Sequence, residues 1–253
     1  MTVSSFAGRS ALITGAASGI GAATAKALDA RGIERLVLVD RDGEGLERLD
    51  LSCRTERHAA DVSDPAFWDK LEKGVGALDH ALVNAGIAAG GPLAQQPFDE
   101  WRKIMSVNLD GAFLTLRLAL RSMQQAGKGG SIVLTSSVTA VKALPGGGAY
   151  AVSKAGIAHL ARIAAIENAD SNIRVNAIAP GGVITGIWES DPGFAKQIAE
   201  KGAEAAFEEA AASTPLKRFA GAEEIAGTIV FLLSDEARNV TGAVISSDGG
   251  LSL

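Results

Sequence analysis

Residues 10–21, SALITGAASGIG, are a short apolar run that passes into a turn with three closely spaced glycines. The run predicts a buried β-strand, and the residues after Gly19 have the pattern of a helix. Gly15 can take a turn conformation closed to other residues, Gly19 lets the backbone approach a pyrophosphate, and Gly21 lets the helix pack close to the sheet. The helix amino terminus then offers free N–H groups to phosphates. The order strand, turn, helix predicts a dinucleotide site, although the spacing G-x3-G-x-G differs from the commoner fingerprint and a ligand-free turn is the alternative.

The second apolar run, RLVLVD at 35–40, ends in Asp40. A carboxylate at this point can accept hydrogen bonds from both adenosine ribose hydroxyls and would repel a 2′-phosphate, which favours NAD over NADP. Arg41 opposes that preference, because a guanidinium beside the ribose could hold the phosphate. Ser18 in the glycine turn supplies no second cation. We therefore expect NAD, with a turn cap as the alternative role of Asp40.

Strand and helix patterns alternate along the whole chain. Further apolar runs lie at 80–86, 131–137, 173–181 and 242–250, with a weaker one at 55–62, and helical patterns lie at 19–32, 64–75, 97–126 and 149–170. Near-continuous apolar strands are typical of parallel sheets that are covered on both faces. The alternation predicts an α/β fold with one domain over residues 1–253. Its core would be a Rossmann-type, doubly wound parallel sheet of about seven strands flanked by helices.

Residues 186–214 depart from this alternation. They combine alanine-rich helical sequence with Trp188, Phe194 and Phe207, and they follow a strand end. Because ligands of open α/β sheets bind at strand ends, we expect residues 186–214 to form a substrate lid. An ordinary pair of surface helices is the alternative.

Composition excludes several classes of protein. The 253 residues are 47% hydrophobic and 21% charged, with a net charge of −5 and no basic stripe, so we expect a folded protein without a nucleic-acid partner. The single cysteine, Cys53, excludes an internal disulfide and indicates a reducing compartment. Without a signal-like start or an apolar run near ~18 residues, a soluble cytoplasmic protein is expected. The scattered histidines, His58, His80 and His159, predict no metal site.

The only tyrosine of the chain lies in GAYAVSKAG, residues 148–156. Tyr150 and Lys154 are four residues apart in a predicted helix, so both lie on one face. A nearby ammonium favours phenolate and lowers the phenol pKa, which suits Tyr150 to proton exchange with a carbonyl or an alcohol. Ser137, at a strand end, can hold the same substrate oxygen. The amide of Asn108 could bind a water that links Lys154 to solvent, or be a solvated polar position.

These motifs together resemble the short-chain dehydrogenase/reductase superfamily. The matching motifs are TGAASGIG at 14–21, Asp40, NAG at 84–86, Asn108, Ser137, YAVSK at 150–154, IRVNAIAPG at 173–181 and SDGG at 247–250. The resemblance implies Tyr150 as general acid/base, Ser137 as the group that orients the substrate oxygen, and Asn108 as a fourth member. Lys154 would hold the nicotinamide ribose and lower the tyrosine pKa. The chain departs from the family at Val83, where a second asparagine is frequent.

The expected cofactor contacts extend along the strand ends. They are Gly15, Ser18, Gly19, Ile20, Gly21, Asp40, Arg41, Asp61, Val62, Asn84, Ala85, Gly86, Tyr150, Lys154, Pro180, Gly181, Val183 and Thr185. Asp61 and the N–H of Val62 are expected at the adenine, with turn formation as the alternative for Asp61. The small residues 84–86 would let the cofactor lie across the sheet edge. The resemblance implies that the last four residues position the nicotinamide.

The loops after the catalytic strands, 88–92, 138–140 and 144–148, carry mainly small side chains, with Lys142 as their cation. They predict a roomy, weakly charged pocket for a bulky or apolar ketone or secondary alcohol. The expected function is therefore an NAD(H)-dependent oxidoreductase for such a substrate. The alternatives are a 3-oxoacyl-thioester (acyl carrier protein) reductase, which would favour NADP, and a dinucleotide-binding sensor or scaffold without turnover.

The long helical patterns at 97–126 and 149–170 are apolar on more than one face, as in Phe113, Ile157 and Ile163. Such faces predict burial against another subunit. The resemblance implies a homotetramer built through these two helices.

Overall fold

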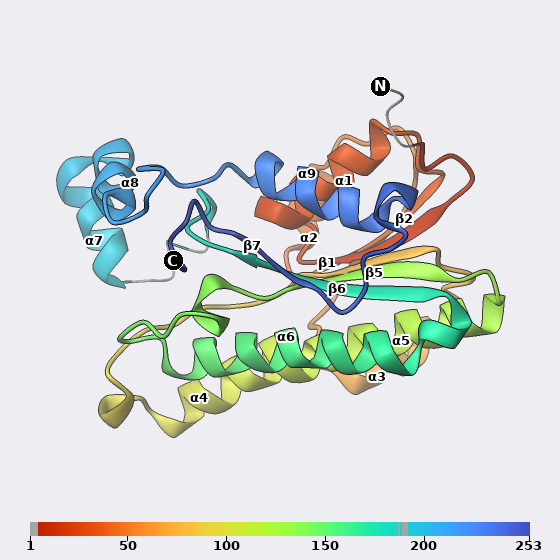
Figure 1. The fold of residues 1–253 in the computed structure, drawn as a ribbon, viewed down its shortest axis with the longest axis horizontal. Coiled ribbons are helices and arrows are strands. Elements are labelled where there is room, and N and C mark those ends of the chain that lie inside the picture. The colour runs from red at the N-terminus through yellow and green to blue at the C-terminus, as the bar shows by residue number, and fades with distance from the viewer. Residues whose placement is uncertain (1–4, 187, 189–191) are drawn as a thin grey trace.

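A seven-stranded sheet forms the centre of the computed structural model, which describes residues 5–186, 188 and 192–253 (Figure 1). The strands are β1 (Ser10–Thr14), β2 (Arg35–Asp40), β3 (Arg54–Ala59), β4 (His80–Val83), β5 (Gly130–Thr135), β6 (Ile173–Pro180) and β7 (Val244–Ser247). They are all parallel, in the order β3-β2-β1-β4-β5-β6-β7. The predicted fold class is confirmed, including the weaker strand pattern at 55–62.

Helices cover both faces of the sheet. They are α1 (Gly19–Asp29), α2 (Gly43–Glu47), α3 (Pro65–Glu72), α4 (Phe98–Met105), α5 (Gly111–Ala126), α6 (Gly148–Glu167), α7 (Pro192–Lys201), α8 (Ala203–Ala211) and α9 (Ala222–Leu233). In Figure 1, α1 and α9 lie on one face, and α3, α4, α5 and α6 lie on the other. Each face has its own buried hydrophobic cluster, so β1 and β4 are buried along their whole length. Their carboxyl ends meet where the strand order reverses, which is where ligands bind in such sheets.

The sequence patterns place most helices correctly but miss the short helix α2 and two further features. Asp64 caps α3 as expected, since its Oδ1 accepts a hydrogen bond from the backbone N–H of Ala66 (2.9 Å). The single helix expected over 97–126 is interrupted by a π-helical turn, Ser106–Asp110, between α4 and α5. Helix α9 has no counterpart among the predicted elements. No helix of the described residues has the length and apolar character that crossing a bilayer requires.

The segment 186–214 contains the helix pair α7 and α8, which lies to one side of the sheet (Figure 1). Its aromatic side chains pack together: the Trp188 ring stacks on Phe219 at 5.4 Å, and Phe194 contacts Phe207 at 5.0 Å. Residues 187 and 189–191 of the predicted lid lie outside the described residues. The lid assignment stays a prediction.

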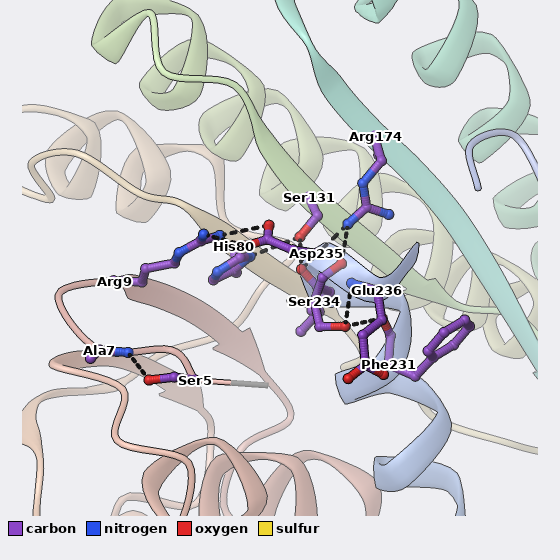
Figure 2. Close-up of polar contacts among 11 residues, drawn as sticks. Ser5, Ala7, Arg9, His80, Ser131, Arg174, Phe231, Ser234, Asp235 and Glu236 are labelled. Carbon is purple, nitrogen blue, oxygen red and sulfur yellow. Dashed lines mark hydrogen bonds and ion pairs between the residues drawn. The ribbon is translucent and has the colours of Figure 1, made fainter. Parts of the chain in front are cut away.

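Arg174 secures the carboxyl end of α9 at the amino edge of the sheet (Figure 2). Its guanidinium donates hydrogen bonds to the carbonyl oxygens of Leu232 (2.8 Å) and Ser234 (3.0 Å). The last carbonyl groups of a helix have no partners within the helix, so a buried end requires such donors. Nearby, Arg9 forms an ion pair with Asp235 (2.7 Å), which ties β1 to the segment after α9.

His80 is buried in the same region and has an unusual hydrogen-bond pattern (Figure 2). Its Nδ1 lies 2.7 Å from Ser131 Oγ, and that hydroxyl donates to the carbonyl of Leu233 (2.7 Å). Since the serine has one proton, Nδ1 must be the donor to Ser131 and Nε2 carries no proton. Among the described residues Nε2 has no hydrogen-bond partner. Protonating it would bury a charge in an apolar environment, where the centre of the Phe6 ring lies 5.1 Å from that of the imidazole.

The buried imidazole predicts that the protein loses stability in mild acid. Burial, followed by the charge of Arg9, lowers the pKa of His80 from 6.5 to about 4, against the opposing charges of Asp79 and Asp235. The unfolded chain then binds more protons than the folded one between these two values. The free energy of unfolding should therefore fall as the pH drops from 6.5 to 4, by up to about 3 kcal/mol.

Urea unfolding at several pH values between 7.5 and 4.5 tests this prediction. His80→Gln should flatten the loss of stability across this range, because the substituted side chain does not titrate. His159→Gln, at an exposed histidine, is the matched control and should keep the wild-type slope. Equal slopes for His80→Gln and the wild type would contradict the assignment.

Candidate active site

The glycine turn after β1 is closed to side chains. Gly15 and Gly19 both have left-handed backbone conformations, with φ of 65° and 52°. A Cβ atom on Gly21 would lie 1.9 Å from the Gly15 carbonyl oxygen, and one on Gly15 would lie 2.8 Å from Asn84 Nδ2. A Cβ on Gly19 would lie 3.1 Å from Thr185, so the turn brings together the predicted residues 15–21, 84 and 185.

The amino end of α1 is suited to an anion. Ser18 is the N-cap residue, but its side chain makes no capping hydrogen bond, and the first turn of α1 contains no acidic residue. Neither the Ser18 side chain nor an acidic residue of the first turn therefore neutralises the positive end of the helix dipole, which lies at the N–H groups of Gly19 and Ile20. These features fit the pyrophosphate of a dinucleotide, as the sequence predicts.

Asp40 contacts the glycine turn directly. Its Oδ2 accepts a hydrogen bond from the backbone N–H of Ala17 (3.0 Å), and its Oδ1 accepts one from Asp42 (3.0 Å). The turn-capping role considered as the alternative is thus present. A carboxylate has about four lone-pair positions, so it can still accept hydrogen bonds from a ribose. Arg41 is exposed, and its charge helps to lower the pKa of Asp61.

Three of the four predicted catalytic side chains meet at the carboxyl end of β5. Lys154 Nζ donates to the carbonyl oxygen of Thr135 (2.8 Å) and lies 5.6 Å from the centre of the Tyr150 ring. The Ser137 side chain lies near enough to the Tyr150 hydroxyl to lower the pKa of the phenol. Its Oγ also accepts a hydrogen bond from Thr139 N–H (3.2 Å), which fixes it at the start of the 3₁₀ turn Val138–Ala140. The serine, the phenol and the ammonium therefore form one cluster.

Gly86 joins this cluster to the glycine turn. A Cβ atom on Gly86 would lie 3.3 Å from Lys154 Nζ and 3.2 Å from Asn108 Oδ1. At the other end of the same short stretch, Asn84 contacts Gly15. Residues 84–86 thus form a continuous bridge from the turn after β1 to Lys154, along the carboxyl edge of the sheet.

Comparison with known proteins agrees with this geometry. A family model described as "Enoyl-(Acyl carrier protein) reductase" matches residues 15–252. Cis-4-hydroxycyclohexanecarboxylate dehydrogenase of Sinomonas cyclohexanicum is 38% identical over 255 residues, which cover 97% of each chain. The chain belongs to the short-chain dehydrogenase/reductase superfamily. Levodione reductase of Leifsonia aquatica is 38% identical over 259 residues, covering 98% of this chain and 95% of the relative.

Solved structures support the same family. A crystal structure of levodione reductase has a TM-score of 0.87 at 37% identity and covers 98% of both chains. Carveol dehydrogenase from Mycobacterium avium, in complex with NAD, has a TM-score of 0.89 at 30% identity and covers 98% of this chain and 99% of its own. Complexes with NAD and with NADP both occur among the matched structures. As a short-chain dehydrogenase/reductase, the protein is an oxidoreductase of a family that binds a nicotinamide dinucleotide.

In this short-chain dehydrogenase/reductase Asn108 also has a structural role that the sequence does not indicate. It lies in the π-helical turn and is fully buried. Its Oδ1 accepts a hydrogen bond from Ile87 N–H (2.8 Å), and its Nδ2 donates to Ile87 O (3.0 Å) and Ser153 Oγ (3.1 Å). Both amide protons are therefore used within the protein, while Oδ1 keeps a second lone pair, so a water that links Asn108 and Lys154 stays a prediction. The amide clamps the backbone directly after Gly86, and its full burial shows that the alternative, a solvated polar position, is wrong.

Asp61 forms a turn, which is the alternative role given for it in the sequence analysis. The carboxylate accepts hydrogen bonds from Ser63 Oγ (2.7 Å) and Ser63 N–H (2.8 Å), and these bonds lower its pKa. Val62 is buried, and its carbonyl accepts a hydrogen bond from the Trp68 indole (2.8 Å). Adenine contacts by Asp61 and Val62 stay predictions.

The residues after β6 converge on the C-terminal segment. Gly181 N–H donates to the carbonyl of Ser247 (3.1 Å), next to the Asp248 backbone, which a Cβ on Gly181 would meet at 2.7 Å. Val183 is bridged to Ala220. Pro180 ends β6, so this stretch leads from the sheet edge to Thr185 over the glycine turn.

The Tyr150 pKa moves opposite to the expectation. Burial raises it, and the neighbouring Ser137 side chain only partly offsets that rise. Lys154 Nζ is directed to the Thr135 carbonyl and not to the phenol oxygen, and burial lowers the pKa of Lys154 to about 8. In the protein alone Tyr150 is therefore firmly protonated, which is the form that donates a proton to a carbonyl.

Two threonines that the sequence reasoning missed organise the site. Thr14 Oγ1 accepts hydrogen bonds from Asn84 N–H (2.9 Å) and Ala85 N–H (3.2 Å), and Thr135 Oγ1 donates to Asn84 Oδ1 (3.1 Å). They join the ends of β1, β4 and β5 where the strand order reverses. Both are the last residue of an apolar run, SALIT and SIVLT, which is the signal that could have found them.

Proposed function

We propose that the protein is an NAD(H)-dependent oxidoreductase that interconverts a secondary alcohol and a ketone, with Tyr150 as general acid/base. The observation that supports this most is the convergence of Ser137, Tyr150 and Lys154 at the end of the bridge from the glycine turn. A sensor or scaffold without turnover would not need a serine, a phenol and a buried ammonium at this point.

The chain's residues divide the work of ketone reduction. A bound nicotinamide dinucleotide supplies the hydride, and the protein supplies position and a proton. The Tyr150 hydroxyl donates its proton to the ketone oxygen, and Ser137 Oγ holds the same oxygen by a hydrogen bond. Lys154, with a pKa of about 8, is charged at pH 7 and stabilises the phenolate that remains. In alcohol oxidation the phenolate accepts the proton.

The cofactor would lie along residues that the structure brings together. Gly15, Gly19 and Gly21 with the start of α1 would hold the pyrophosphate. Asp40 would accept hydrogen bonds from the adenosine ribose, and Lys154 would donate to the nicotinamide ribose. Because a carboxylate at position 40 would repel a 2′-phosphate, we favour NAD over NADP, and the neighbouring Arg41 is the feature that opposes this choice.

The apolar rim near Tyr150 supports a bulky or apolar substrate. Leu93, Val141 and Leu144 are exposed on the loops after β4 and β5. Leu93 contacts the start of α6, since a Cβ on Gly148 would lie 3.1 Å from its Cδ1. The relative cis-4-hydroxycyclohexanecarboxylate dehydrogenase is named for a cyclic secondary alcohol. We infer a ring ketone and its alcohol as the substrate class.

A 3-oxoacyl-thioester reductase is the second candidate, since a relative from Thermotoga maritima that is 36% identical over 253 residues is named 3-oxoacyl-[acyl-carrier-protein] reductase. An assay of cofactor oxidation separates the candidates. It should compare a cyclohexanone series with a 3-oxoacyl thioester, each with NADH and NADPH. Fast turnover of the ring ketones with NADH supports the proposal. Preference for the thioester with NADPH supports the second candidate, and binding without turnover supports a sensor.

Asp40→Ala tests the cofactor choice. Removing the carboxylate removes its repulsion of a 2′-phosphate, so the ratio of kcat/KM for NADPH to that for NADH should rise about tenfold or more. The lost hydrogen bonds to Ala17 and Asp42 affect both cofactors alike, so the ratio is the readout. Asp42→Ala, at the neighbouring cap of α2, is the control and should leave the ratio unchanged. An unchanged ratio in Asp40→Ala would mean that Asp40 does not contact the ribose.

We also propose a homotetramer. Phe113 on α5 and Val152, Ile163 and Ile166 on α6 are exposed, with Ile166 at 80%. Helices α4, α5 and α6 lie on one face of the sheet (Figure 1). An apolar face of this kind is typical of a subunit interface. Light scattering at micromolar protein should give the mass of a tetramer, and a monomer would refute the proposal.

A further inference from the structure

The helix that carries Tyr150 and Lys154 does not fix its own start. Helix α6 begins at Gly148, at the end of the run PGGG, residues 145–148. Its N-cap residue is Gly147, which has no side chain to cap it, and Gly146 has a left-handed φ of 81°. Consecutive glycines allow many backbone conformations. Tyr150, the third residue of α6, therefore needs an anchor from elsewhere.

Gln96 provides that anchor from the loop between β4 and α4. Its Oε1 accepts a hydrogen bond from the backbone N–H of Ala149 (3.1 Å), one of the unpaired N–H groups of the first turn of α6. Its Nε2 donates to Oε1 of Glu100, in the first turn of α4 (3.1 Å). Since an N–H can only donate and a carboxylate can only accept, the two partners fix the orientation of the amide.

Two further contacts show that this loop is built against α6. A Cβ atom on Gly148 would lie 2.5 Å from Gln96 Oε1, so a side chain at that position would displace the Gln96 amide. The backbone N–H of Gly91 donates to the carbonyl oxygen of Gly146 (2.9 Å). At its other end the loop is clamped by Asn108 through Ile87. The loop therefore connects the end of the NAG stretch with the start of α6.

We propose that Gln96, oriented by Glu100, is a positioning residue for Tyr150. The proposal rests on the function assigned to Tyr150 above. Ala149 directly precedes Tyr150, so loss of its hydrogen bond lets the first turn of α6 open and moves the phenol relative to Ser137. Catalysis is sensitive to such movement, since a misplacement of about 1 Å can cost about 100-fold in rate. Partial opening should cost about tenfold.

The kinetic experiment compares Gln96→Met with Gln95→Met, a matched control at the exposed neighbouring glutamine. Gln96→Met should lower kcat for ketone reduction about tenfold, with the Kd for NADH within about twofold of the wild type. Gln95→Met should match the wild type in both. Equal kcat values for the two variants would overturn the proposal.

A charge exchange between Gln96 and Glu100 provides a rescue. Gln96→Glu alone places two carboxylates together and should lower kcat as Gln96→Met does. In the double variant Gln96→Glu with Glu100→Gln, residue 100 donates and residue 96 accepts from both Ala149 and residue 100. Its kcat should return to within about threefold of the wild type. A double variant that binds NADH normally but stays as slow as Gln96→Glu would overturn the proposal.

Hydrogen exchange gives a readout that does not need turnover. Amide exchange in a peptide containing residues 148–152 should be faster in Gln96→Met than in Gln95→Met. If the wild type bound NADH but reduced no ketone or thioester, the proposed function would fail, and this comparison would still decide whether Gln96 holds the start of α6. Equal exchange in the two variants would overturn the positioning role.

Discussion

Tyr150→Phe is expected to lower kcat for ketone reduction about 100- to 10,000-fold while NADH binding stays within about twofold of the wild type. The substitution removes the one proton that the site places for the ketone oxygen and leaves the ring in place. Lys154 keeps its hydrogen bond to Thr135, so the lysine should still be able to hold the cofactor. Steady-state assays with a cyclohexanone and a fluorescence titration with NADH measure the two quantities.

A fall in kcat alone would not prove that the phenol transfers a proton. The control is Ser137→Ala, which removes a hydrogen bond to the same oxygen but no acid, and it should cost less than Tyr150→Phe. Thermal unfolding should show both variants folded. If Tyr150→Phe kept a tenth or more of the wild-type turnover, another group would have to be the acid, and the mechanism proposed above would be wrong.

Gly21→Ala is expected to destabilise the protein by about 3 kcal/mol or more and to abolish NADH binding. Its Cβ would lie 1.9 Å from the Gly15 carbonyl oxygen. Gly15 cannot move away easily, because Asn84 and the backbone of Ala85 are packed against it. A Cβ atom placed on Gly15 would lie 2.8 Å from Asn84 and 3.0 Å from the Ala85 backbone. Relief would require the start of α1 to move away from the sheet, which destroys the turn proposed to hold the pyrophosphate.

Gly227→Ala is the matched control. Gly227 lies within α9, is exposed, and has no atom within 4 Å of an added Cβ. The same substitution there should stabilise the helix by about 0.5–1 kcal/mol. Urea unfolding and NADH titration of both variants test the pair. A Gly21→Ala variant with wild-type stability and affinity would show that the turn adapts and is not the cofactor cradle.

The sheet was predictable because each buried parallel strand appears as a continuous apolar run. The cap of α3 was predictable because Asp64 and Ala66 are neighbours in sequence. The contacts of Asn108 with Ile87, 21 residues away, and of Gln96 with Ala149, 53 residues away, were not. They join elements whose relative placement only the folded structure defines.

The pKa of Tyr150 is a further property that could not be predicted from the sequence alone. A spacing of four residues predicts that a phenol and an ammonium share a helix face, but it does not say toward which atom the ammonium points. The structure directs Lys154 to Thr135, and burial of the phenol raises its pKa by more than the neighbouring Ser137 lowers it. The sequence therefore predicted which residues form the candidate site, but only the structure shows in which direction the pKa of Tyr150 is shifted.

The most direct test is a crystal structure of the protein with NADH and a slowly reduced cyclic ketone. We predict that the pyrophosphate lies against the glycine turn at 15–21 and that the ketone oxygen lies within about 2.6–3.2 Å of both the Tyr150 hydroxyl and Ser137 Oγ. A dinucleotide bound away from that turn, or a ketone oxygen out of reach of the phenol, would contradict the account.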